Sequence, residues 1–141
     1  GESYVDSKAA SVMGIYENTV DGMMTDYVFP QENGHRESVK WFCIGDGEDG
    51  MLCRMEDKLG LNLANYTDES LEKAQHPFEI EKADEVIIHL DYRHSGLGSN
   101  SCGEEQLEEN KVKLQDFAMA FTLQTAKSGT ETSEARKQYI D

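Results

Sequence analysis

The sequence has 141 residues, the length of one ordinary domain, and a chain of this size can bury a real core. Its 13 basic and 28 acidic residues give a formal net charge of −15, which argues against nucleic acid and anionic membranes as partners because both attract positive surfaces. No apolar run approaches the roughly 18 residues of a membrane helix. Because the sequence begins with Gly1 and not Met, we expect a segment of a longer protein.

The first strands are predicted by apolar residues that alternate with period two. Residues 39–44 alternate in this way, residues 45–50 form a turn rich in glycine and aspartate, and residues 51–55 are typical of the returning strand. Residues 61–63 predict a further short strand. The sequence therefore predicts a hairpin followed by a separate strand.

One short helix is expected next. Thr67 is a suitable N-cap, and Glu69 and Lys73 have the i,i+4 spacing of a helical ion pair. Pro77 restricts the backbone of the residue before it, so the helix should end there.

Two later segments, residues 86–92 and 117–123, again alternate with period two. This pattern buries one face of an antiparallel sheet, so we predict an all-β fold, a β-sandwich with one short helix. Residues 126–141 are polar and lack a strand pattern, and we expect a loose tail there.

The three cysteines, Cys43, Cys53 and Cys102, are odd in number and too few for a disulfide framework. We expect free, partly buried thiols in a reducing compartment, which favours the cytoplasm. A disulfide between Cys43 and Cys53 across the predicted hairpin is the alternative.

Two groups of residues that could carry chemistry are better explained without it. Four neighbouring acids could supply the carboxylate pair of a glycosidase, but nothing apolar surrounds them to raise one pKa, so we expect a solvated surface. These acids are Glu104, Glu105, Glu108 and Glu109. His89 and His94 are five residues apart on a strand, so their side chains point to opposite faces and no metal site is expected.

A glycine-rich loop follows the strand that contains these histidines. Gly96 and Gly98 begin like a dinucleotide-binding loop, but the third glycine that would open a helix is missing, so we expect no cofactor. Glycine lets the backbone approach a ligand closely, and Asn100, Ser101 and Cys102 follow beside it. Spacing alone supports a contact with a sugar hydroxyl and a tight structural turn equally.

Several segments that occur in one order along residues 2–124 together form a family pattern. Two are specific, namely PQENG at residues 30–34 followed by Arg36, and DYRHSGLGSNSCG at residues 91–103. They resemble the last domain of glycoside hydrolase family 2 β-galactosidases. The first stretch, the short helix and the closing strand of that domain are similar to residues 2–16, 66–77 and 117–123.

The resemblance implies the C-terminal half of a β-supersandwich of the galactose-mutarotase type, formed by residues 1–125 and followed by a tail at residues 126–141. It also implies a parent enzyme that hydrolyses terminal non-reducing β-D-galactose residues, as in lactose, with retention. In this family two glutamates on a (β/α)₈ barrel carry the reaction, and a barrel needs about 250 residues. We therefore expect no catalytic residue in this chain and no activity from it alone.

The resemblance also implies a role for the glycine-rich loop. In the family this loop reaches the mouth of the barrel, where a Trp or Cys lines the platform for the departing sugar. By position Cys102 takes this substrate-binding role, with Ser101 and Asn100 beside it. A cysteine cannot stack on a sugar ring as a tryptophan does, so leaving-group preference should differ. Glu104 stands where the family usually has proline.

The remaining implications concern partners. The barrel, the preceding sandwich domains and a galactoside are the expected partners, in a parent that is a homo-oligomer. Such enzymes commonly use Mg²⁺ and Na⁺ at sites outside this segment, and relatives occur in both the cytoplasm and the periplasm. Two alternatives stay open. One is a stand-alone carbohydrate-binding module, although Trp41 lies within an alternating strand and not on a display surface. The other is the small subunit of a two-chain β-galactosidase.

Overall fold

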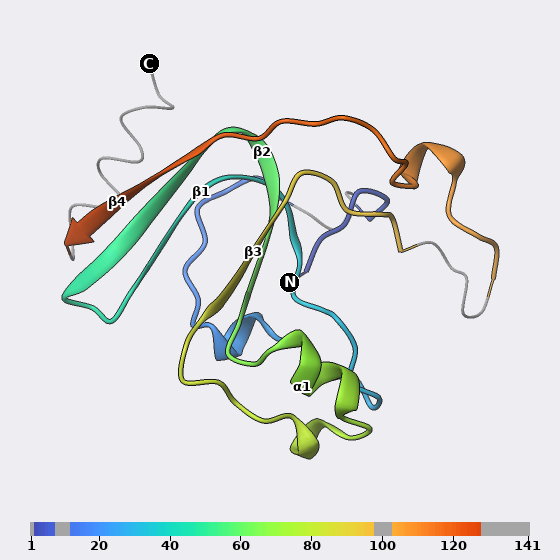
Figure 1. The fold of residues 1–141 in the computed structure, drawn as a ribbon, viewed down its shortest axis with the longest axis horizontal. Helices are drawn as coiled ribbons and strands as arrows, with labels where there is room; N and C mark the ends of the chain where they lie inside the picture. The colour runs from blue at the N-terminus through green and yellow to red at the C-terminus, as the bar shows by residue number, and fades with distance from the viewer. Residues whose placement is uncertain (1, 8–11, 98–102, 128–141) are drawn as a thin grey trace. The chain divides into compact units, whose positions relative to one another are not determined.

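The computed structural model describes residues 2–7, 12–97 and 103–127 (Figure 1). Most of the regular secondary structure among these residues is strand, with a single short α-helix, which confirms the all-β prediction. No helix in the described ranges has the length and apolar character needed to cross a membrane. In chain order the elements are η2 (Asp21–Met23), β1 (Arg36–Gly45), β2 (Asp49–Ala64), α1 (Asp68–Lys73), η3 (Pro77–Glu79), β3 (Ile87–Asp91), η4 (Glu108–Asn110) and β4 (Phe121–Lys127).

Strand β2 is the centre of the sheet. The strand order is β1-β2-β3, and β4 also pairs with β2. The C-terminal part of β2 pairs antiparallel with β3, from Gly60 opposite Asp91 to Ala64 opposite Ile87. Its N-terminal part pairs antiparallel with β4. These strands belong to one sheet, so the second layer of the predicted sandwich stays a prediction.

The predicted turn between β1 and β2 is present. The Asp46 carboxylate accepts hydrogen bonds from the backbone N–H groups of Glu48 and Asp49 at 2.9 and 3.0 Å, and Gly47 has a φ of +102° that favours glycine. The prediction of two strands after this turn was wrong, because β2 runs without a break from Asp49 to Ala64. The charged residues 56–58 are exposed within it, and the N–H of residue 56 still bonds to the carbonyl of Ala120 at 3.0 Å.

The later strands keep their type but differ in extent. Strand β3 lies within the predicted residues 86–92. Strand β4 begins later than predicted and continues to Lys127, so Ala126 is a buried strand residue. The remainder of the predicted tail lies outside the described residues.

Helix α1 begins as predicted. The Thr67 side chain accepts a hydrogen bond from Ser70 N at 3.2 Å, and Lys73 Nζ lies 2.6 Å from Glu69 Oε1. The helix ends at Lys73, several residues before Pro77. The reason is local, since Glu79 in η3 accepts from the N–H groups of residues 75 and 76 and so satisfies donors outside the helix.

The chain divides into two compact units, one formed by residues 1–37 and 60–115 and the other by residues 38–59 and 116–141. In the second unit Leu52 and Ala126 form a buried cluster against which Trp41 packs, so Trp41 is a core residue. Cys53 in this unit is a buried free thiol and therefore forms no disulfide with Cys43.

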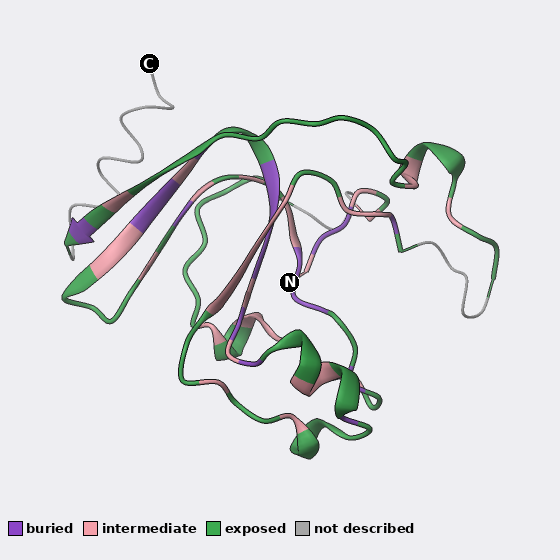
Figure 2. Cartoon of the chain, viewed as in Figure 1, coloured by how far each residue is buried: buried purple, intermediate pink, exposed green. Residues whose placement is uncertain are grey.

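The buried positions of the first unit (Figure 2) include polar residues beside the apolar ones. Buried polar groups are stable only when they are hydrogen-bonded. The buried polar residues of this unit are Ser3, Asn33, His35 and Asn62.

Candidate functional site

The three residues predicted to contact substrate, Asn100, Ser101 and Cys102, lie outside the described residues. The structure does describe the chain on either side of them, up to Leu97 and again from Gly103. The candidate site is therefore described from the residues on either side of this loop.

Two hydrogen bonds donated by backbone N–H groups join the residues just before this loop to residues that follow it. Gly96 N donates to the carbonyl of Asn110 at 2.9 Å, and Val112 N donates to Ser95 Oγ at 3.2 Å. The segments before and after the loop are thus hydrogen-bonded to each other, as in compact loops whose ends lie close together. We call residues 95–97 together with 110–112 the loop neck.

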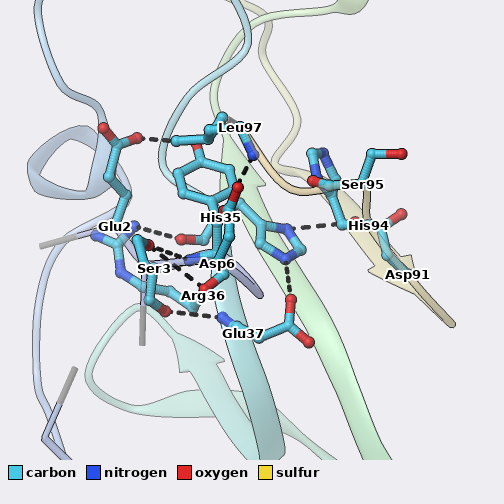
Figure 3. Close-up of polar contacts among 12 residues, drawn as sticks. Glu2, Ser3, Asp6, His35, Arg36, Glu37, Asp91, His94, Ser95 and Leu97 are labelled. Atoms are coloured by element: carbon cyan, nitrogen blue, oxygen red, sulfur yellow. Dashed lines mark hydrogen bonds and ion pairs between the residues drawn. The ribbon is translucent and has the colours of Figure 1, made fainter. Parts of the chain in front are cut away.

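A carboxylate from the start of the chain also binds the loop neck. Asp6 Oδ1 accepts a hydrogen bond from Leu97 N at 3.0 Å (Figure 3). The approach is close enough to require glycine at the preceding position, since a Cβ on Gly96 would lie 2.5 Å from Asp6 Oδ2 and 3.0 Å from Asn110 Cβ. Gly96 is itself buried.

Three aromatic rings lie beneath the loop neck. The His94 and His35 ring centroids are 4.5 Å apart, and Tyr4 stacks on His35 with centroids 5.5 Å apart and an angle of 23° between the planes. His94 also approaches Tyr4 at 5.6 Å and has Nε2 3.6 Å from Glu32 Oε1. The residue that leads into the loop is therefore packed against two elements distant in sequence.

His35 is a fully buried side chain between two carboxylates (Figure 3). Its Nε2 lies 3.0 Å from Glu37 Oε2, and its Nδ1 lies 3.5 Å from Asp91 Oδ2, an ion-pair distance too long for a good hydrogen bond. Burial would lower the pKa of His35, but Asp91 and Glu37 outweigh it and raise the pKa to about 9. His35 is thus an imidazolium at neutral pH, and it lowers the pKa of Asp91 in turn.

Gly60 on β2 makes room for this imidazolium. A Cβ at Gly60 would lie 2.9 Å from His35 Nε2, closer still to Cε1, and 3.1 Å from Asp91 Cβ. The His35 ring cannot move aside freely because Tyr4 and His94 cover it. Glycine at this strand position is therefore required by close packing and not by backbone conformation.

A partly buried carboxylate, that of Glu2, is held by a second set of hydrogen bonds in the same unit. Glu2 Oε2 accepts from Tyr4 Oη and from Gly34 N, both at 3.0 Å, and Glu2 Oε1 accepts from the Tyr27 hydroxyl. Burial would raise the pKa of Glu2, but these hydrogen bonds and the nearby Arg36 guanidinium lower it. Glu2 is therefore a carboxylate that holds the start of the chain against the PQENG segment.

The amide of Asn33 completes this group. Its Oδ1 accepts from Thr25 N at 2.9 Å and its Nδ2 donates to the carbonyl of Gln31 at 3.1 Å, while its own carbonyl accepts from Asn62 Nδ2 at 2.9 Å. Gly34 follows with a φ of +81°. Within the PQENG segment, Asn33 is thus a buried amide with hydrogen-bond partners on both of its polar atoms, whereas Gln31 and Glu32 are exposed.

The two specific motifs and the start of the chain meet in this one cluster. Residues 2–7, 33–37 and 91–97 supply many of the groups described above, and all belong to the first unit. Reasoning from the sequence treated these segments separately and missed the buried charge of His35 and the partly buried charge of Glu2. No local pattern reveals such contacts, because their partners come from distant parts of the chain.

The acids and histidines considered from the sequence do not form a reaction centre. The four acids of residues 104–109 are exposed, as predicted, and Lys111 pairs with Glu105 and Glu108 at 3.3 and 2.5 Å. His89 approaches Asp68 at 3.6 Å and is not paired with His94. Within the described part of the chain, no three His, Cys, Asp or Glu side chains are grouped so as to hold a metal ion.

The electrostatics of the carboxyl groups also matter here. A general acid of a glycosidase needs a raised pKa. At five carboxyl groups the surroundings instead lower the pKa through hydrogen bonds or neighbouring cations, so these groups stay ionised. They are Glu2, Asp46, Glu79, Asp91 and Glu108.

Residues 1–123 match the family model described as the beta galactosidase small chain. A β-galactosidase of Actinobacillus pleuropneumoniae is 33% identical over 122 residues, which make up 86% of this chain and 12% of that protein. A β-galactosidase of Arthrobacter sp. (strain B7) is 32% identical over 131 residues, 89% of this chain and 13% of that protein. One of Staphylococcus xylosus is 27% identical over 86% of this chain and 12% of its own length. The chain thus spans about 12% of the length of the curated relatives it matches.

Proposed function

Since this chain belongs to the beta galactosidase small chain family, we propose that it is the C-terminal segment of a β-galactosidase that hydrolyses terminal non-reducing β-D-galactose residues of lactose-type substrates. The match over residues 1–123 carries this proposal. The contacts that join the two specific motifs and the start of the chain support it, because the residues that form the family pattern then lie together in this chain.

The bond-breaking groups are proposed to lie elsewhere in the parent enzyme. Retention requires a nucleophile and an acid/base carboxyl about 5–5.5 Å apart, one of them with a raised pKa. The relatives are about eight times longer than the matched region, which leaves ample length for a (β/α)₈ barrel. The lowered pKa values of the five carboxyl groups above support a structural role for them. We expect the isolated chain to be inactive.

The contribution of this segment is proposed to be a rim loop at the active site. Cys102, with Ser101 and Asn100, would line the platform for the leaving group. The closed loop neck supports this role, because a loop that must present side chains to a ligand needs fixed ends. A thiol offers less area than an indole ring for stacking on a sugar. We therefore expect acceptor sugars to bind more weakly here than in relatives that have Trp at this position.

The barrel, the preceding sandwich domains and a second copy of the parent are the proposed protein partners, and the cytoplasm is the proposed location. Mg²⁺ and Na⁺ are proposed to bind outside this segment, and no step is assigned to them here.

The first experiment assays the chain on a chromogenic galactoside, alone and within the full-length enzyme. We expect turnover from the full-length enzyme only, and comparable turnover from the chain alone would reject the proposal.

The second experiment replaces Cys102 by Trp in the full-length enzyme and measures transfer to acceptor sugars. Transfer and leaving-group release that do not change would remove the rim role. Micromolar binding of lactose by the chain alone would favour a carbohydrate-binding module instead.

A further inference from the structure

The loop neck has one anchor that is a side chain from far away in the sequence. Its other ties, Gly96 N to Asn110 O and Val112 N to Ser95 Oγ, join neighbouring parts of the same loop. Among the contacts described for the loop neck, the hydrogen bond from Leu97 N to Asp6 Oδ1 is the one that connects it to the start of the chain. The position of the Leu97 backbone therefore depends on where the Asp6 carboxylate lies.

The Asp6 carboxylate is itself held in place by a short turn. Ser7 N donates to the Tyr4 carbonyl at 3.0 Å and Tyr4 N donates to Ser7 Oγ at 2.9 Å, which closes the turn around Asp6. This turn is docked on β1, since Ser3 N donates to the carbonyl of His35 at 2.8 Å and Ser3 Oγ accepts from Glu37 N at 2.9 Å. The backbone that carries the carboxylate is thus held by hydrogen bonds that do not involve the loop.

The chemistry of the contact favours a fixed geometry. A hydrogen bond from a backbone N–H to an ionised carboxylate is stronger than one between neutral groups. Gly96 brings its backbone against the second oxygen, so that a Cβ there would lie 2.5 Å from Oδ2. One oxygen therefore binds Leu97 while the other packs against Gly96, and the carboxylate is fitted to the backbone on both sides.

We propose that Asp6 is a positioning residue for the proposed rim loop, because its carboxylate fixes the Leu97 backbone that leads into this loop. This inference rests on the proposed function of that loop. Asp6 acts through Leu97 N and touches no substrate itself. Its loss should change how the enzyme handles the leaving group and acceptor sugar while the galactose-binding chemistry of the barrel continues.

The first test measures the anchor in the 141-residue chain, independently of any activity. Hydrogen exchange of the Leu97 amide is followed by NMR in the wild type, Asp6→Ala, Asp6→Asn and the control Asp84→Ala, which removes an exposed carboxylate. Loss of a hydrogen bond to a charged group should reduce protection of Leu97 by about tenfold to a hundredfold in Asp6→Ala. Asp6→Asn retains an acceptor and should recover most of it. Unchanged protection in a folded Asp6→Ala would overturn the proposal.

The second test uses the full-length enzyme. In Asp6→Ala we expect the KM for lactose to rise and transfer to acceptor sugars to fall by about tenfold, with kcat for a nitrophenyl galactoside within twofold of the wild type. Asp6→Asn should rescue both, and Gly96→Ala should reproduce the defect. A merely structural role would lower every parameter together and would overturn the inference.

A parallel Cys102→Ala variant separates this inference from the function on which it rests. If Cys102→Ala alters leaving-group handling and Asp6→Ala does not, the rim role stands and the positioning role is rejected. If neither variant alters it, the rim role itself is rejected, whatever the exchange of Leu97.

Discussion

The buried imidazolium of His35 makes the stability of this chain depend on pH in a defined direction. The folded pKa is about 9 and the ordinary value is 6.5. A group whose pKa is raised in the folded state contributes stability that is complete below the unfolded pKa and is lost as pH rises through the folded pKa. A difference of about 2.5, at about 1.4 kcal/mol for each tenfold change, corresponds to about 3 kcal/mol of unfolding free energy lost between about pH 6.5 and 10.

The assay is urea unfolding of the 141-residue chain, followed by circular dichroism at intervals from pH 6 to pH 10. The comparison variant is His35→Gln, which keeps a polar side chain but cannot be charged. Cys53 also titrates at high pH in both proteins, because burial raises the pKa of its thiol, so the difference between the two curves isolates His35. We expect the wild type to lose about 2–3 kcal/mol more than His35→Gln over this range. Parallel curves would refute the reasoning.

Three further predictions follow from single contacts. Gly60→Ala would press a methyl group against the buried imidazole and should lower the unfolding free energy by about 2 kcal/mol. The control Gly14→Ala, where a Cβ would have its nearest neighbours at 3.4 Å, should change the unfolding free energy by no more than about 0.5 kcal/mol. Equal effects of the two substitutions would contradict the packing argument. Thr67→Ala removes the helix N-cap and should cost about 1 kcal/mol by the same measurement, and no change would show that the cap is unimportant. In the native chain a thiol reagent should modify the exposed Cys43 well before the buried Cys53, and simultaneous modification would contradict the burial.

Local signals predicted local structure well in this chain. The cap at Thr67, the pair of Glu69 and Lys73, and the turn at Asp46 and Gly47 each depend on residues a few positions apart, and each is present. The continuity of β2 was missed because three consecutive charged residues interrupt its apolar pattern. These residues are exposed to solvent within the strand, so their charges need not be buried.

The candidate site could be predicted only in outline. Motif resemblance pointed to segments that meet in the cluster around His35, but the contacts between His35, Gly60 and Asp91 join residues whose separation in sequence hides them from any periodic pattern. The role of Asp6 was likewise invisible until its carboxylate could be placed beside Leu97. Cys102, Ser101 and Asn100 stay predictions, because they lie outside the described residues.

The closed loop neck has a practical consequence for enzyme engineering. Its ties use backbone groups, one serine hydroxyl and one carboxylate, all of which lie outside residues 98–102. Exchanging residues 98–102 for those of a relative therefore leaves all of the contacts described for the neck in place. Libraries grafted between Leu97 and Gly103 would therefore test the proposed rim role while these contacts are kept.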